Sequence, residues 1–124
     1  MAQEFTAMTL SAATNGLPIK VMAVATAGTT IHTATSSDMP EGCDEVYLWA
    51  GNIGPSATNG SLYFSSDGAG DKRVNFRVPA AFNGPIQVLA GHRVCDGVVI
   101  TATASAAEVI LLWGNVNRIS GQGT

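Results

Sequence analysis

The stretch Glu108-Val-Ile-Leu-Leu-Trp-Gly-Asn-Val-Asn-Arg-Ile119 is long, apolar and close to the C-terminus. Just before it, Gly97-Val-Val-Ile-Thr-Ala-Thr-Ala104 is β-branched at most positions. Residues of this kind suit a pleated, buried sheet better than a helix, because branching at Cβ restricts the side chain against a preceding helical turn. The two stretches therefore predict neighbouring strands at the end of an all-β chain.

Shorter stretches of the same kind alternate with turn signals along the rest of the chain. The clearest period of two is in residues 73–78, where Val74, Phe76 and Val78 would face inward and the residues between them outward. No 11-residue window keeps a helical apolar stripe. We expect a single compact β-sandwich or jelly-roll-like barrel of about eight strands. The expected strands are 19–26, 29–34, 44–50, 62–64, 73–78, 85–90, 97–104 and 108–119, and the expected tight turns include Asn15-Gly16, Asn59-Gly60, Asp67-Gly68, Asn83-Gly84 and Asp96-Gly97.

The first residues differ from the others, because they are rich in Ala, Thr and Ser and have a weak period. We interpret residues 1–17 as an N-terminal arm that orders against a neighbour, and residues 18–124 as the β-sandwich domain. The alternative is an edge strand with Phe5, Ala7 and Thr9 on one face.

Composition limits the function classes. The 124 residues suffice for one domain, 46% of them are hydrophobic, and only 12% are charged, about half the usual share. Such low charge suggests that much of the surface lies against other protein. The six Lys and Arg are scattered and the net charge is −3, so we expect no nucleic-acid binding. No apolar stretch is long enough to span a membrane, and no secretory signal is visible, so synthesis in a cytoplasm is expected.

Candidate metal and redox residues are few. Cys43 and Cys95 could form one bridge, but free, buried thiols are the more common state in proteins made in a cytoplasm. Together with His32 and His92 they match a zinc site by number and not by spacing. The pair Asp67 and Asp71 resembles a calcium loop but lacks further oxygen ligands, and a hairpin tip explains it more simply. We expect no metal and no cofactor.

Catalytic groups are also lacking in the sequence. The acids cluster at Glu41, Asp44 and Glu45, which is typical of a solvated rim rather than of a carboxylate pair in a cleft. No serine has the context of a nucleophile elbow. Asn59-Gly60-Ser61 matches a glycosylation sequon but suits a turn. We therefore predict that the chain is not an enzyme.

Aromatic side chains are the better functional candidates. Tyr47 and Trp49 alternate with Val46 and Leu48, so they form either an exposed interface or the second face of a strand buried on both sides. Leu111 and Trp113 alternate with apolar residues in the same way, which favours a homo-oligomer. The candidate interface residues are Phe5, Tyr47, Trp49, Trp113 and Arg118.

An internal echo links two of these strands. Leu48-Trp-Ala-Gly-Asn52 is similar to Leu112-Trp-Gly-Asn115, and each places a Trp before Gly and Asn. We expect both tryptophans near one end of the sandwich, with Gly114 permitting a bulge.

Four segments of the chain form a further pattern. They are Asp44-Glu-Val-Tyr-Leu-Trp-Ala-Gly-Asn52, Pro55-Ser-Ala57, Arg73-Val-Asn-Phe-Arg-Val-Pro-Ala80 and Ala104-Ser-Ala-Ala-Glu-Val-Ile-Leu-Leu-Trp-Gly-Asn-Val-Asn-Arg-Ile119. The pattern spans about residues 44–119, and its most specific part is the ending with Gly114 and Asn117-Arg118-Ile119. It resembles small virion proteins of tailed bacteriophages, and most closely their capsid decoration or cement proteins.

The resemblance implies a compact β-sandwich that assembles as a homotrimer on the outer surface of an icosahedral head. Its partner would be the major capsid protein, and its role would be to stabilise contacts between capsomers. The family has no catalytic residues to carry over, and the region before Asp44 does not match. Two alternatives stay open: a head-fibre, neck or tail component, and a carbohydrate-binding β-sandwich that presents Tyr47, Trp49 and loop 51–60.

Overall fold

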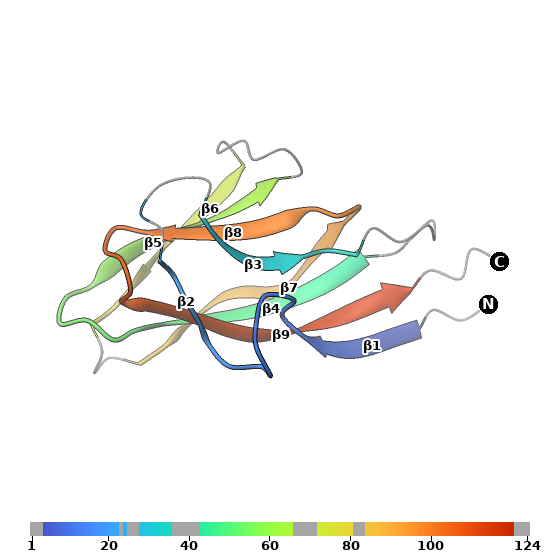
Figure 1. Ribbon diagram of the computed structural model, residues 1–124, viewed down its shortest axis with the longest axis horizontal. Coiled ribbons are helices and arrows are strands. Elements are labelled where there is room, and N and C mark those ends of the chain that lie inside the picture. The colour runs from blue at the N-terminus through green and yellow to red at the C-terminus, as the bar shows by residue number, and fades with distance from the viewer. Residues whose placement is uncertain are drawn as a thin grey trace.

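The computed structural model describes residues 4–22, 24, 28–35, 43–65, 72–80 and 84–120, with the backbone alone at residues 4, 5, 65 and 120. These residues form nine strands in two antiparallel sheets that pack face to face (Figure 1). The predicted all-β fold and β-sandwich are confirmed.

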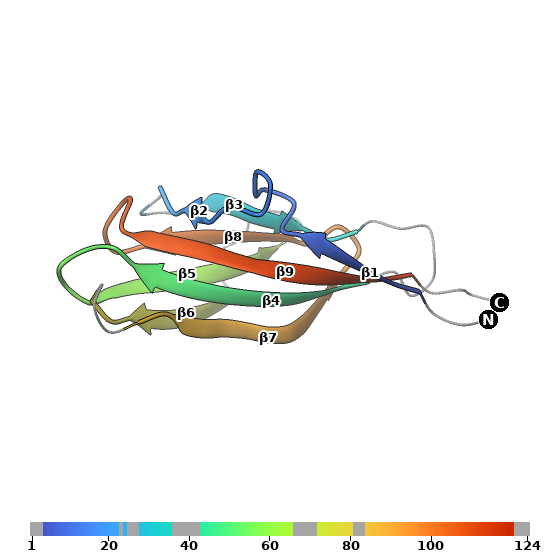
Figure 2. The same ribbon diagram turned by 90° about the horizontal axis from the view of Figure 1, so that it is seen from below.

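Sheet A holds the long strands of the molecule. Its order is β1-β9-β4-β7, and the short strand β2 pairs with β9 beside β1. Figure 2 shows β9, β4 and β7 side by side in this sheet. The bounds are β1 (Glu4–Thr9), β2 (Ile19–Lys20), β4 (Cys43–Asn52), β7 (Ile86–Cys95) and β9 (Ile110–Ser120).

Sheet B has the order β3-β8-β5-β6, so β3 and β6 are its edges. Its strands β8 and β5 pair in register from Gly60 with Ala104 to Ser65 with Val99. The bounds are β3 (Thr29–Thr33), β5 (Thr58–Ser65), β6 (Arg73–Val78) and β8 (Val99–Ala104).

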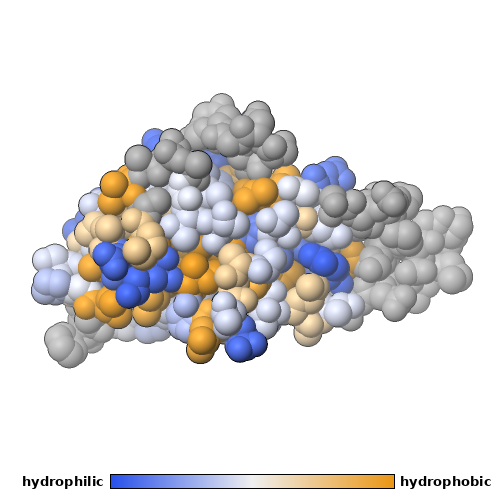
Figure 3. Space-filling view, in the orientation of Figure 1, coloured by the Kyte–Doolittle hydropathy of each residue, from blue (hydrophilic) through white to orange (hydrophobic). Residues whose placement is uncertain are grey.

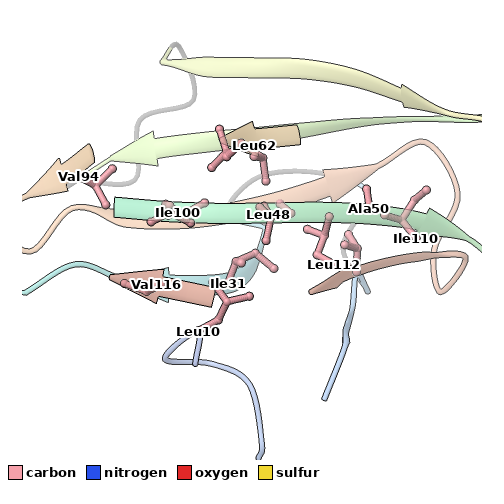
Figure 4. Packing of buried hydrophobic residues seen from close by; sticks show 14 of the residues in the cluster. Leu10, Ile31, Leu48, Ala50, Leu62, Val94, Ile100, Ile110, Leu112 and Val116 are labelled. Atoms are coloured by element: carbon pink, nitrogen blue, oxygen red, sulfur yellow. The ribbon is translucent and has the colours of Figure 1, made fainter. Parts of the chain in front are cut away.

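The core lies between the sheets and follows from the period of two. In β4, Val46, Leu48 and Ala50 have no exposed surface, whereas the residues between them are half-buried. Their counterparts on sheet B include Leu62 and Ile100, and Figure 4 shows these side chains meeting between the layers. Close packing of branched aliphatic side chains from both sheets is the main stabilising contribution of such a core.

The N-terminal segment is part of this sandwich. Residues 4–9 form the edge strand β1, paired with β9 over six residues, as in the alternative that the sequence left open. Leu10 follows with only 1% of its surface exposed and belongs to the core cluster, and it lies among core residues in Figure 4. The interpretation of residues 4–10 as an arm that orders only against a neighbour is therefore wrong, because β9 offers these residues an open edge within the same chain.

Several strand boundaries also differ from the expectation. Asn59 and Gly60 lie inside β5 rather than in a turn, because Gly60 stands opposite Phe76 and the Phe76 ring occupies the space that a side chain at Gly60 would need. β7 extends beyond the expected strand 85–90, since it continues through Gly91 to Cys95 and shifts register against β4. Of the expected strand 19–26 only residues 19–20 form β2, while residues 23 and 25–27 lie outside the described residues.

Gly114 does not produce a bulge. The pairing of β9 with β4 is continuous through Leu48 and Gly114. A Cβ atom at Gly114 would overlap the carbonyl oxygen of Tyr47, so the glycine permits the two backbones to approach closely.

The two cysteines are bonded to each other. Cys43 and Cys95 stand directly opposite at the paired ends of β4 and β7, and their Cα atoms are 4.3 Å apart. The expectation of free, buried thiols is wrong, because a separation of 52 residues says nothing about a register that places both residues side by side.

Candidate functional site

The outer face of sheet A carries the aromatic residues singled out in the sequence. Trp49 on β4 and Trp113 on β9 are register partners, and both are half-buried. Tyr47 lies two residues before Trp49 on the same face. The structure thus joins three of the five candidate interface residues on one surface, and this surface is not covered by another described strand.

A hollow of about 520 Å³ opens beside the two tryptophans. We call it the tryptophan hollow, and it is lined by Trp49, Pro85, Trp113, Gly114 and Asn115. Next to it lies a smaller hollow of about 220 Å³ that shares Pro85 and Trp113. The smaller hollow is also lined by Gly51, Asn52, Ile53, Gly84 and Leu111.

Two glycines leave space for the aromatic rings. A Cβ atom at Gly51 would lie 2.9 Å from the Trp113 ring, so the ring rests on the bare backbone of β4. Likewise, a Cβ atom at Gly91 would lie 3.2 Å from the Tyr47 hydroxyl oxygen. Each ring therefore packs against the backbone of a neighbouring strand at a glycine.

The chemistry of the tryptophan hollow is that of binding. None of its five lining residues is titratable, and its polar groups are the indole N–H groups and the Asn115 amide. Ile53 beside it keeps 57% of its surface exposed. A half-buried aromatic pair with few polar groups suits an apolar protein surface or the face of a sugar ring.

A second notable cluster lies inside the sandwich. Asp44 has no exposed surface and accepts hydrogen bonds from two side chains, Arg118 and His32. Arg118 Nε lies 2.9 Å from Asp44 Oδ1, Arg118 Nη2 lies 3.0 Å from Oδ2, and His32 Nε2 lies 2.6 Å from Oδ2. The expectation that Asp44 belongs to a solvated rim is wrong, because β4 points this residue toward the core.

The backbone of Ser11 determines the tautomer of His32. Ser11 N–H donates to His32 Nδ1 at 3.0 Å, so Nδ1 carries no proton and the neutral ring donates from Nε2 to Asp44. Burial acts to raise the pKa of Asp44, but hydrogen bonds from Arg118 and His32 outweigh it and hold this pKa below its ordinary value of 3.8.

This cluster joins parts of the fold and has no nucleophile. The Ser11 hydroxyl accepts from Thr33 N–H at 2.8 Å, and both ring nitrogens of His32 have other partners, Ser11 N–H and Asp44. The side chains of His32 and Asp44 are both wholly buried, so a substrate has no access to them. The cluster connects β3, β4, β9 and the segment after β1.

Of the remaining predicted residues with described side chains, Arg118 lies apart from the tryptophan hollow. Arg118 donates to Asp44 and leaves 30% of its side chain exposed, while the side chain of Phe5 lies outside the described residues. Asp67 and Asp71 also lie outside them. Within the described ranges, no three His, Cys, Asp or Glu side chains gather as a metal site, and no helix could span a membrane.

Sequence reasoning missed Pro85 and Asn115 as lining residues of the hollow. Asn115 follows Trp113 in the echoed segment, so the repeated Trp-Gly-Asn pattern was a usable signal. No sequence signal marked Pro85. It lies just before β7, and only the sheet order shows that β7 is next to β4, which carries Trp49.

Asn52, in the other copy of the echo, is a buried structural residue. Its Nδ2 donates to Ser56 O at 2.7 Å, and its Oδ1 accepts from Gly54 N–H at 2.8 Å. It thereby shapes the loop between β4 and β5.

No protein-family model, curated protein or solved structure matches this chain.

Proposed function

We propose that this chain is a structural virion protein that binds the outer surface of an icosahedral phage head and stabilises contacts between capsomers. The observation that carries the proposal is the paired, half-buried Trp49 and Trp113 on the outer face of sheet A. Tryptophan is among the residue types that contribute most binding energy in protein interfaces.

The character of the surface supports a protein that has contacts on several sides. On the face in Figure 3, weakly polar and hydrophobic residues cover most of the described surface, and strongly hydrophilic ones form separate spots. Decoration works by multivalency, since many identical weak contacts repeated on a lattice stabilise a capsid that one contact would barely affect. The resemblance over residues 44–119 implies that the protein forms a trimer and that its partner is the major capsid protein.

The decisive experiment counts this chain against the major capsid protein in purified particles of the source virus. Hundreds of copies per particle, or one trimer per threefold position, support the decoration role. A dozen or a few dozen copies point instead to a head fibre, neck or tail component. Absence from the particle overturns the virion proposal.

The tryptophan hollow makes a further prediction about assembly. If it forms the contact between protomers, Trp113→Ala should shift the purified protein from trimer to monomer in light scattering, with the fold retained in circular dichroism. Leu17→Ala is the matched control, because Leu17 is an exposed apolar residue outside the hollow, with 61% of its surface exposed. If the wild-type protein is monomeric at all concentrations tested, the proposal of a trimer is wrong.

A second candidate function is carbohydrate binding at the same face. The observation that favours it is the hollow itself, where two indole rings lie beside the Asn115 amide, because a sugar combines apolar ring faces with hydroxyl groups. In that case Trp49→Ala should abolish binding to a neutral glycan. If the protein binds no sugar on a broad glycan panel, carbohydrate binding at this face is ruled out.

A further inference from the structure

The outer face of sheet B carries a row of polar side chains at its β6 edge. On β6, Arg73, Asn75 and Arg77 point outward, and all three are exposed. Opposite them on β5 stand Asn59, paired with Arg77, and Ser61, paired with Asn75. We call these five residues the donor stripe.

The hydrogen bonds inside the donor stripe engage the side-chain oxygen atoms of its two asparagines and leave their N–H groups available. Arg77 Nη1 donates to Asn59 Oδ1 at 2.9 Å, and Ser61 Oγ donates to Asn75 Oδ1 at 2.8 Å. Both amide oxygens are therefore engaged. Among the described residues no hydrogen bond uses the Nδ2 groups of Asn59 and Asn75, so the stripe presents N–H donors to a ligand.

The charge of the donor stripe is positive although the chain is acidic overall. Arg73, Arg77 and the preceding Lys72 are three of the six Lys and Arg in a chain of net charge −3. In the described part of the chain the ion pairs of arginine are those of Arg93 and Arg118, so neither arginine of the stripe is neutralised there. Arg73 and Arg77 are four residues apart, so their Cα atoms are about 13 Å apart along β6.

A hollow of about 450 Å³ lies at one end of the stripe. It is lined by Asn59, Gly60, Ser61, Asn75, Phe76 and Arg77. Gly60 and Phe76 pair between the outward residues, and Phe76 packs against the core, so backbone forms the base of the hollow. A group that enters there meets one guanidinium and two amide N–H donors.

We propose that the donor stripe binds an acidic polysaccharide, with a sugar carboxylate at Arg77 and sugar hydroxyls on the amides of Asn59 and Asn75. A carboxylate accepts charge-assisted hydrogen bonds from guanidinium, which are stronger than neutral ones. The amides of Asn59 and Asn75 add neutral donors beside the Arg77 guanidinium, and a uronic acid residue offers hydroxyl acceptors for them on the same ring as its carboxylate. The site lies on sheet B and is independent of the tryptophan hollow on sheet A.

The test measures binding of polygalacturonate to the immobilised full chain, with dextran as a neutral sugar polymer and polyglutamate as an acidic polymer without sugar. We expect polygalacturonate to bind, to weaken at high salt, and to bind more tightly than the other two polymers. Arg77→Gln should raise the dissociation constant about tenfold, because it removes a charged donor. Asn75→Ala should raise it about threefold.

Arg93→Gln is the matched control, because it removes the same charge from an exposed arginine on β7 of sheet A. It should leave the dissociation constant within about twofold. Equal losses from Arg77→Gln and Arg93→Gln would overturn the proposal in favour of unspecific charge attraction. Equal or tighter binding of polyglutamate would overturn it in favour of an acidic protein partner, and no binding of polygalacturonate at low salt would overturn it outright.

Discussion

The guanidinium of Arg118 and the carboxylate of Asp44 form a two-point ion pair inside the sandwich, with N–O distances of 2.9 Å and 3.0 Å. The same carboxylate accepts from His32 on the other sheet. One acidic residue therefore connects both sheets, and His32 extends the connection to the backbone of Ser11. Breaking such a pair from one side leaves an uncompensated group in the core.

Asp44→Asn should lower the free energy of unfolding by about 3 kcal/mol, because it leaves the partly buried Arg118 without its counter-charge. Urea unfolding at neutral pH measures the loss. Glu45→Gln is the matched control, since the adjacent pair of Glu45 with Arg93 is exposed on the arginine side and should contribute less than about 1 kcal/mol. Equal losses from the two variants would contradict the role assigned to Asp44.

The same pair predicts how stability depends on pH. Because the pKa of Asp44 is lower in the folded state than its ordinary value of 3.8, the contribution is fully present above that value. It is lost as the pH falls through the folded-state pKa. The wild-type protein should therefore lose stability in acid more steeply than Asp44→Asn, as measured by unfolding midpoints in a pH series. Parallel profiles would show that other carboxyls are responsible.

Leu10→Ala should destabilise the protein by about 3 kcal/mol, since Leu10 is 1% exposed and its removal leaves a cavity between the sheets. Leu17→Ala, seven residues later and 61% exposed, should change stability by less than about 0.5 kcal/mol. Denaturant unfolding of both variants measures the two changes in the free energy of unfolding. Two equally small effects would restore the view that this segment is an arm outside the core.

Reduction of the Cys43–Cys95 disulfide should lower stability by about 4 kcal/mol on the chain-entropy account, since the bond closes a loop over a separation of 52 residues. The measurement compares unfolding with and without reductant, alongside the variant with both cysteines changed to Ala. A thiol assay on the denatured, unreduced chain should find no free thiol. Two free thiols would contradict the bond.

Gly114→Ala should weaken the protein by about 3 kcal/mol or more, because the added methyl group would overlap the Tyr47 carbonyl and force β4 and β9 apart. Gly84→Ala serves as the control. It meets no neighbouring atom, and only its positive φ of 83° adds a cost of about 1 kcal/mol. The melting temperature of Gly114→Ala should lie well below that of Gly84→Ala. The reverse order would contradict the close approach of the β4 and β9 backbones.

The alternation of residue types was enough to predict the all-β class and the position of β6, which agrees with the structure at both ends. It also separated Tyr47 and Trp49 from Val46 and Leu48, because successive side chains of a strand point to opposite faces whatever the strand pairs with. Turn signals were less reliable. Asn15-Gly16 and Asp96-Gly97 have the expected positive φ at both residues, yet Asn59-Gly60 lies in a strand, because glycine opposite an aromatic residue serves packing as well as turning.

Local pattern thus predicted most of the strands and the apolar face of β4, since both depend on residues a few positions apart. It left β1 open between an arm and an edge strand, and Val74 on β6, expected to face inward, keeps 39% of its surface exposed. Tertiary structure alone decided which distant residues meet. Trp49 faces Trp113, Cys43 is bonded to Cys95, and Asp44 lies between Arg118 and His32. These contacts depend on strand order and register, which are set when both sheets bury their apolar faces together, and no short stretch of sequence carries that information.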